Sequence, residues 1–406
     1  MLINYFLFMV TLLAFAGLAI DVGMMQWRSL RVQHAADAAA QEAMYQYFRG
    51  DTSWSSEGQA QATMNGFSNG VNGATVSLLY PPTSGPLTGD TLSIQANVTQ
   101  TFNTLFMGLL KGGSSSVTAT ATAREIPTCV WIMNPSSPSN GSLALASASM
   151  SPNCGVYVNT ASGYTLGVDG FANLYSLRNR VVGVASTASI STGGIGPQPK
   201  YGAAVKKDPL AYVTAPTLTT CTYTSVSYSS GSHTLSPGSY CGGITLSSTT
   251  ITLNAGLYMI DGGMNVSNSN IYGTGVTLYF TKKSASPSYT TVKFNSSNSS
   301  TYGIYLKAPT VSSGGAIKGV VMFADRNWVS HGSQGIQIVG YTITGDGFWY
   351  LLNTGLYLWA CPFTYSTYNG LVIDNIYQFG ASSHFASDFS QLGGSPLHYE
   401  DGVLEQ

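Results

Sequence analysis

The first hydrophobic segment, residues 1–20, contains no charged residue, and Asp21 follows it directly. Twenty residues of helix measure about 30 Å, the thickness of a bilayer's hydrocarbon core. An alanine-rich run continues the helical pattern beyond Asp21, and no Gly or Pro occurs in residues 25–48. Because alanine has the highest helix propensity, we predict one helix over about 3–48, apolar first and amphipathic later.

Residues 51–126 predict a small α+β unit. A helical pattern lies at 56–68, and a short helix ending on a glycine is expected at 102–112. Strands are expected at 75–80, 91–100 and 116–125. With the helix of residues 1–50, this unit has a pilin-like arrangement.

Residues 127–406 consist of short β-forming runs separated by Ser, Asn and Gly, and some runs repeat. CVWIMN (129–134) recurs as CGVYVN (154–159) at an offset of 25, and LSPGSYCGG (235–243) recurs as LNAGLYMIDGG (253–263) at an offset of 18. Such offsets are typical of a β-solenoid, in which each coil buries its apolar side on the next. The predicted fold class is therefore mainly β: a long N-terminal helix, a small α+β unit and a β-solenoid body. A two-sheet β-sandwich is the alternative for the body, since it also has alternating strands at short spacing.

Charge is scarce along the chain. Charged residues make up 8% of the 406 positions, and the net charge is −1. No basic patch stands out, so nucleic acid is not an expected partner. A hydrophobic content of 44% and 25 tyrosines indicate a folded protein rather than a disordered one. Polarity comes from Ser, Thr, Gly, Asn and Tyr, which suits a cell-envelope or extracellular protein that makes neutral contacts.

Five cysteines are present, and their spacing favours disulfides over metal ligation. None belongs to a CxxC pair or has a histidine at ligand spacing, so we expect no metal and no cofactor. Cys129 with Cys154 and Cys221 with Cys241 are the natural local pairs, and both would persist only in an oxidising compartment. Buried free thiols are the alternative. Cys361 is left over.

The stretch GLAIDVGMMQWRSLRVQHAADAAAQEA (17–43) resembles the N-terminal signature of TadG-like proteins of the Tad/Flp pilus system. The residues that carry the match are Gly17, Leu18, Ala19, Asp21, Gly23 and the run 35–40. The Cys-apolar-Asn repeats, PGSYCGG and the closing GVLEQ resemble the C-terminal region of many such proteins. The chain differs from major pilins in having Tyr5 where they use a glutamate to order assembly. The resemblance implies a pilus protein whose partners are the membrane before assembly, and then copies of itself or other Tad components.

The charges after the apolar segment raise a question of topology. Arg28 and Arg31 would place the body in the cytoplasm by the positive-inside rule, whereas the cysteines and the uncharged body indicate the opposite side. A signal peptide fits poorly, because the segment lacks a basic n-region and an A-x-A site. We expect instead that residue 1 follows a removed basic leader, as in type IV pilin precursors.

Asp21 allows two interpretations. It could lie among the lipid headgroups, where a carboxylate is solvated. Alternatively, it could pair with Arg28 or Arg31 of a neighbouring helix and fix the stagger between subunits. Gly17 and Gly23 are the expected bend points of the helix. These five residues form the candidate assembly site.

Catalysis is not expected, because carbohydrate-active solenoids need clustered carboxylates or calcium. The acidic residues of the body are scattered in sequence: Asp261, Asp325, Asp346, Asp374 and Asp388. His233, His331, His384 and His398 have no nucleophile motif nearby. ADRNW (324–328) is interpreted as a salt-bridged turn, and the aromatic stretch 345–359 as core or as a sugar-binding or subunit-contact face.

The predicted function is a structural subunit of an extracellular pilus-like filament, with the helices in its assembly core and the β body outside. Two alternatives remain. One is a membrane-anchored accessory protein of the Tad pilus, and the other is a tethered glycan-binding or carbohydrate-active β-helix protein.

Overall fold

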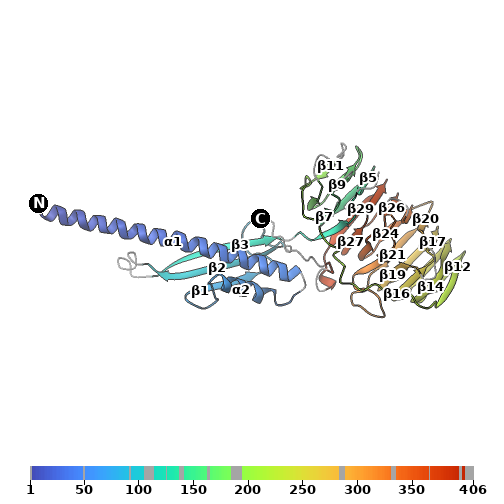
Figure 1. The fold of residues 1–406 in the computed structure, drawn as a ribbon, viewed down its shortest axis with the longest axis horizontal. Coiled ribbons are helices and arrows are strands. Elements are labelled where there is room, and N and C mark those ends of the chain that lie inside the picture. Colours follow the sequence, from blue (N-terminus) through green and yellow to red (C-terminus); the bar gives the residue numbers. More distant parts are fainter. Residues whose placement is uncertain are drawn as a thin grey trace. The chain divides into compact units, whose positions relative to one another are not determined.

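The computed structural model describes residues 2–48, 51–90, 93–104, 114–124, 126–136, 141–161, 165–183, 194–282, 289–330, 335–364, 366–392 and 396–397. The chain forms two compact units, one holding residues 1–125 and the other residues 126–400. Each is described by itself (Figure 1).

The first unit is a long helix with a small α+β partner. Helix α1 (Leu2–Phe48) is continuous, as predicted, and passes through Gly17 and Gly23 without interruption. The other elements are α2 (Trp54–Met64) and the antiparallel strands β1 (Ala74–Leu79), β2 (Ser93–Asn103) and β3 (Ser114–Arg124), in the order β1-β2-β3.

The helix predicted at 102–112 is wrong at its start. Phe102 and Asn103 belong to β2, because they continue its pairing with Ser115 and Ser114 of β3. Residues 105–112 of that prediction lie outside the described residues.

The alanine-rich half of α1 forms the core of this unit. Val32, Ala35, Ala36, Ala39 and Ala40 are all buried, and they pack with small residues of α2, β2 and β3. Their short side chains allow close approach: a Cβ on Gly58 of α2 would lie 2.9 Å from the Ala39 carbonyl oxygen. The alanines therefore serve packing as well as helix propensity.

The second unit is a parallel β-solenoid, confirming the predicted body. Its coils contribute strands to three ladders, and their inward side chains form one continuous core. The first ladder contains β4 (Thr128–Ile132), β7 (Gly155–Val158), β10 (Arg178–Val181), β16 (Gly256–Asp261), β19 (Val276–Thr281), β22 (Val320–Ala324), β25 (Gly347–Leu351) and β27 (Tyr368–Ile373). The second contains β5 (Leu143–Ala146), β8 (Leu166–Val168), β17 (Met264–Ser267), β20 (Val292–Asn295), β23 (Ile336–Val339), β26 (Leu356–Trp359) and β28 (Ile376–Phe379).

The third ladder contains β6 (Ser149–Pro152), β9 (Asn173–Tyr175), β11 (Gly194–Gly196), β13 (Gly231–Leu235), β15 (Thr249–Leu253), β18 (Asn270–Thr274), β21 (Gly303–Lys307), β24 (Thr342–Thr344) and β29 (Ser382–Ser387). Strand β14 (Gly238–Ser247) pairs with β16 at its start and with β17 at its end, so it bends from the first ladder into the second. Strand β12 (Tyr223–Tyr228) pairs along β14, and a short 3₁₀ helix, η3, spans Ser390–Leu392.

The order of coils along the solenoid differs from their order in the sequence. Strands β4, β5 and β6 pair in parallel with β27, β28 and β29, so the first coil stacks on the last. Figure 1 shows this as green strands beside red ones, with yellow-green β12 and β14 at the opposite end. We call the contact between residues 128–152 and 368–387 the seam. A connecting segment, residues 201–220, carries the chain back to begin the coils at β12.

The repeat offsets predicted from sequence are partly corrected. Leu235 pairs with Leu253, as the offset of 18 requires, but Tyr240 pairs with Ile260 rather than with Tyr258. In the other repeat the strands pair at an offset of 27 at Thr128 and of 26 from Val130 onward, rather than at 25, and β4 is irregular between these two residues. A one-residue shift exchanges the inward and outward sets. Trp131 and Tyr157 therefore stack on the outside, with ring centroids 5.2 Å apart.

Candidate functional site

The N-terminal half of α1 is the most unusual surface of the first unit. Its large apolar side chains are exposed, from Ile3 at 75% to Leu30 at 63%, and burial becomes continuous only near Val32. By length and composition α1 could cross a membrane, and only 6% of its most apolar stretch is buried. An apolar helix of this length needs a bilayer or other apolar helices around it.

Asp21 is the exception within this exposed half, because only 1% of it is accessible. It shares a helical face with Arg28, Val32 and Ala35, since these positions follow one another at intervals of three, four or seven residues. This face packs on the α+β partner. Asp21 therefore lies at the N-terminal limit of the buried stripe of α1.

Both arginines of the candidate assembly site contact their own chain. The Arg28 guanidinium donates to Gln100 Oε1 at 3.3 Å and lies 4.3 Å above the Phe102 ring, both on β2. Arg31 donates to the Asn65 carbonyl oxygen at 3.5 Å, and its guanidinium lies 5.7 Å from the Phe67 ring. These contacts connect α1 to the rest of the unit, and no pattern in the sequence indicated them.

The five candidate assembly residues thus have different surroundings. Asp21 and Arg28 lie on the buried face, and Arg31 reaches the turn after α2. Gly23 is exposed, and a Cβ added there would meet nothing within 4 Å. Gly17 is half-buried, whereas its neighbours in the apolar segment are exposed.

Comparison with known families identifies this helix. Residues 5–46 match the family model described as "Putative Flp pilus-assembly TadE/G-like". The long helix is therefore similar to the Tad domain of that family. The match covers both the exposed apolar half and the alanine-rich buried half of α1. It includes neither the three-stranded sheet of the first unit nor the solenoid. No curated protein and no solved structure matches the chain.

The acidic residues that looked scattered in sequence are partly aligned in space. Asp261, Asp325 and Asp374 end or follow β16, β22 and β27 of the first ladder. Asp261 and Asp325 are two ladder steps apart, roughly 10 Å. Asp325 accepts from Thr281 Oγ1 at 2.9 Å, and Asp374 accepts from Asn134 Nδ2 at 3.0 Å. These two carboxylates connect neighbouring coils.

The remaining acidic and histidine candidates show other contacts. Asp346 pairs with Lys307 at 3.2 Å and accepts from the Thr367 amide at 2.8 Å. His233 stacks on Tyr228 with ring centroids 3.8 Å apart. Asp388 and His384 lie at the end of β29 and within it, whereas His331 and His398 lie outside the described residues. Among the residues that the structure describes, no group of three or more His, Cys, Asp or Glu could hold a metal ion.

Arg326 of the ADRNW cluster holds the connecting segment against the solenoid. Its guanidinium donates to the Leu210 carbonyl oxygen at 2.7 Å and to that of Val213 at 3.0 Å. Its Nε donates to the Tyr350 hydroxyl, which in turn donates to Asp208 at 2.6 Å. Burial and the nearby Asp208 carboxylate raise the pKa of Tyr350. The cluster is a salt-bridged turn whose acidic partner, Asp208, comes from the connecting segment.

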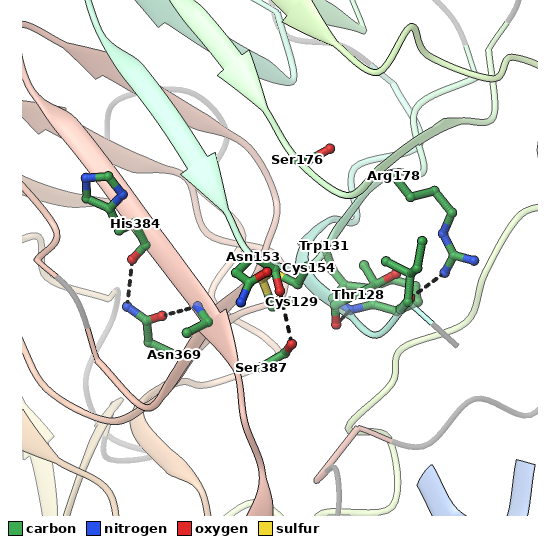
Figure 2. Close-up of a disulfide and its surroundings, with 12 residues drawn as sticks. Thr128, Cys129, Trp131, Asn153, Cys154, Ser176, Arg178, Asn369, His384 and Ser387 are labelled. Carbon is green, nitrogen blue, oxygen red and sulfur yellow. Dashed lines mark hydrogen bonds between the residues drawn. A yellow bond between two sulfur atoms is a disulfide. The ribbon is translucent and has the colours of Figure 1, made fainter. Parts of the chain in front are cut away.

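Two disulfides connect neighbouring coils. Cys129 is bonded to Cys154 beside the seam, and Cys221 to Cys241 at the β12 end. Figure 2 shows the first disulfide next to Asn153, whose carbonyl oxygen accepts from Ser387 Oγ across the seam at 3.2 Å. The Cys361 thiol is free and fully buried, and burial raises its pKa to about 11.

Proposed function

We propose that the protein is a filament-forming structural subunit of a Tad/Flp-type pilus. In this proposal α1 holds the subunit in the inner membrane before assembly and then packs with the α1 helices of other subunits. The solenoid is displayed on the outer side, where the oxidising environment preserves its disulfides. The role is structural rather than enzymatic.

The observation that carries the proposal is the exposed apolar half of α1 within the Tad domain. Removing one large apolar side chain from water is worth about 1.5–3 kcal/mol. The helix therefore favours a bilayer, and packing against identical helices offers it a second apolar environment.

A membrane-anchored accessory protein of the same system is the second candidate. It is supported by the burial of Asp21 within its own chain and by the contacts of Arg28 with Gln100 and Phe102. A subunit whose charged groups are already engaged can remain in the membrane as a single copy.

The two candidates differ in where the protein is found. Cells are sheared, and the released material and the membrane fraction are probed with an antibody to residues 126–400. Decoration of negatively stained filaments along their length supports the subunit proposal. Protein confined to the membrane fraction of piliated cells contradicts it and favours the accessory role.

A further inference from the structure

Four aromatic side chains line the outer side of the second ladder. They are Tyr357 and Trp359 of β26 and Tyr377 and Phe379 of β28. The strands pair in register, so Tyr357 lies beside Tyr377 and Trp359 beside Phe379. We call these four residues the aromatic surface.

The rings of the aromatic surface are ordered by mutual stacking. Tyr357 and Tyr377 are nearly parallel, with an interplanar angle of 6° and centroids 5.5 Å apart. Trp359 and Phe379 have centroids 4.1 Å apart. The alternate side chains of the two strands, Leu356, Leu358, Ile376 and Gln378, are fully buried. The sheet therefore presents the rings outward in a fixed arrangement, which lowers the entropic cost of binding.

A second row of aromatic residues, on the first ladder, is buried and serves packing, so it can be compared with the aromatic surface. Trp131, Tyr157 and Tyr350 lie on the outer side of the first ladder, and all are buried. The connecting segment covers this row: Tyr157 donates to the Ala204 carbonyl oxygen and Tyr350 to Asp208. By contrast, Trp359 is 41% exposed and its three neighbours are half-buried.

The positions flanking the aromatic surface carry no charge. Gln337 and Val339 precede it on β23, and Ala144 and Ala146 follow it on β5. Because both β5 positions are alanine, the row of rings does not continue onto β5. Phosphate-bearing ligands such as nucleic acids would require cations here.

From this geometry we propose that the aromatic surface binds a neutral glycan. A pyranose ring has an apolar C–H face that stacks on an aromatic ring and a rim of hydroxyl groups. The Tyr357 and Tyr377 hydroxyls can exchange hydrogen bonds with that rim. A second copy of the chain is the weaker occupant, because a stable protein interface buries about 800 Å² per partner. Beyond Gln337 the ladder continues with exposed, polar Lys293 and Asn265 rather than apolar residues.

The test uses the full chain in detergent micelles and native affinity electrophoresis. The gels contain hydroxyethyl cellulose, dextran or galactomannan as neutral polysaccharide probes. The parent protein should be retarded by at least one of them, and Trp359→Ala and Tyr377→Ala should weaken that binding at least tenfold. Trp359→Phe should retain most of it.

Tyr272→Ala is the matched control, because Tyr272 is also 41% exposed and stacks on Tyr305 at 4.8 Å. Its binding should equal that of the parent. Equal weakening by Tyr272→Ala, or no retardation of the parent by any probe, overturns the proposal. A change in the sedimentation of Trp359→Ala, without polysaccharide binding by the parent, assigns the surface to a second copy and also overturns it. None of these outcomes depends on whether the protein forms filaments.

Discussion

Val130 lies beside Leu371 in parallel register, although 241 residues separate them in the sequence. Ile132 pairs with Ile373 in the same way. These pairs form the seam, where the first coil of the body closes on the last. The coils that begin at β4 are therefore held by the C-terminal coils across the seam, in addition to the contacts that the connecting segment makes with Tyr157 and Asn159.

We predict that weakening the seam releases those coils. Ile132→Ala removes a fully buried side chain and should lower the free energy of unfolding by about 2–5 kcal/mol. Limited proteolysis should then cleave within residues 126–200 much faster than in the parent. Ile304→Ala, equally buried in the third ladder but away from the seam, should cost similar stability without that cleavage. Identical proteolytic patterns would contradict the role of the seam.

The thiols should become reactive in three steps. A thiol reagent at pH 8 should modify no cysteine in the native chain, because Cys361 is buried and its pKa is raised to about 11. Denaturation should expose one thiol, and reduction of the denatured chain should expose all five. Replacing Cys221 and Cys241 by serine should cost about 3 kcal/mol in the chain-entropy estimate. Five reactive thiols before reduction would exclude both disulfides.

Arg326 should control access to the connecting segment. Arg326→Met keeps an apolar stem but removes the hydrogen bonds to Leu210 and Val213, each worth about 1.5–3 kcal/mol for a charged donor. Trypsin should then cut after Lys206 and Lys207 at a markedly higher rate. Lys318→Met, a change at an exposed cation, is the control. An unchanged cleavage rate would show that other contacts suffice.

Asp21→Ala distinguishes a role in assembly from a role inside the subunit, where Asp21 is already buried. If it fixes the stagger between helices, Asp21→Ala should reduce filament number, since an unpaired buried charge costs about 3–5 kcal/mol at each subunit. Asp37→Ala is the matched control, because Asp37 is on the same helix but accepts only a local bond from Gln33. Filaments are counted by microscopy and normalised to protein in the membrane fraction. Parental filament numbers would leave Asp21 with a role inside its own subunit.

Alkaline pH should destabilise the solenoid. Burial raises the pKa of Tyr341 to about 12, above its ordinary value of 10. Between these values the unfolded chain loses this proton while the folded chain keeps it, so stability falls as pH rises from 10 to 12. Each such tyrosine contributes up to about 1.4 kcal/mol per pH unit. Tyr341→Phe should flatten the dependence measured by denaturant titration, and an unchanged slope between pH 10 and 12 would contradict this contribution.

Much of the fold could be predicted from sequence because its signals are local. Helix propensity and the absence of Pro predicted α1, and alternation predicted strands β1, β2 and β3. The order of coils could not be predicted, because neighbouring coils share the same apolar pattern and nothing local specifies that β4 pairs with β27. The pairing of Trp131 with Tyr157 was missed because aligning the two cysteines gives an offset of 25, whereas the strands pair at an offset of 26.

The candidate site was predictable only in outline. The Tad signature and the uncharged run identified the exposed half of α1. The partners of Arg28 and Arg31 lie on β2 and after α2, more than thirty residues away in the sequence. Local sequence patterns do not predict contacts at that separation. The alignment of Asp261 with Asp325 could not be predicted either, because the coils differ in length. The coil from β19 to β22 is much longer than the coil from β16 to β19.

The seam also determines how the body would respond to mechanical load. Tension transmitted along the chain from residue 125 reaches the solenoid at β4, a strand with hydrogen-bonded neighbours on both sides, β27 and β7. A solenoid pulled from a terminal coil can unwind one coil at a time, because each terminal strand is paired with a neighbour on one side only. Here the pulled strand must separate from β27 and β7 at once. In addition, its second residue, Cys129, is crosslinked to Cys154. The strand at which tension enters the body is thus held on both sides and crosslinked, so it should resist unfolding under load.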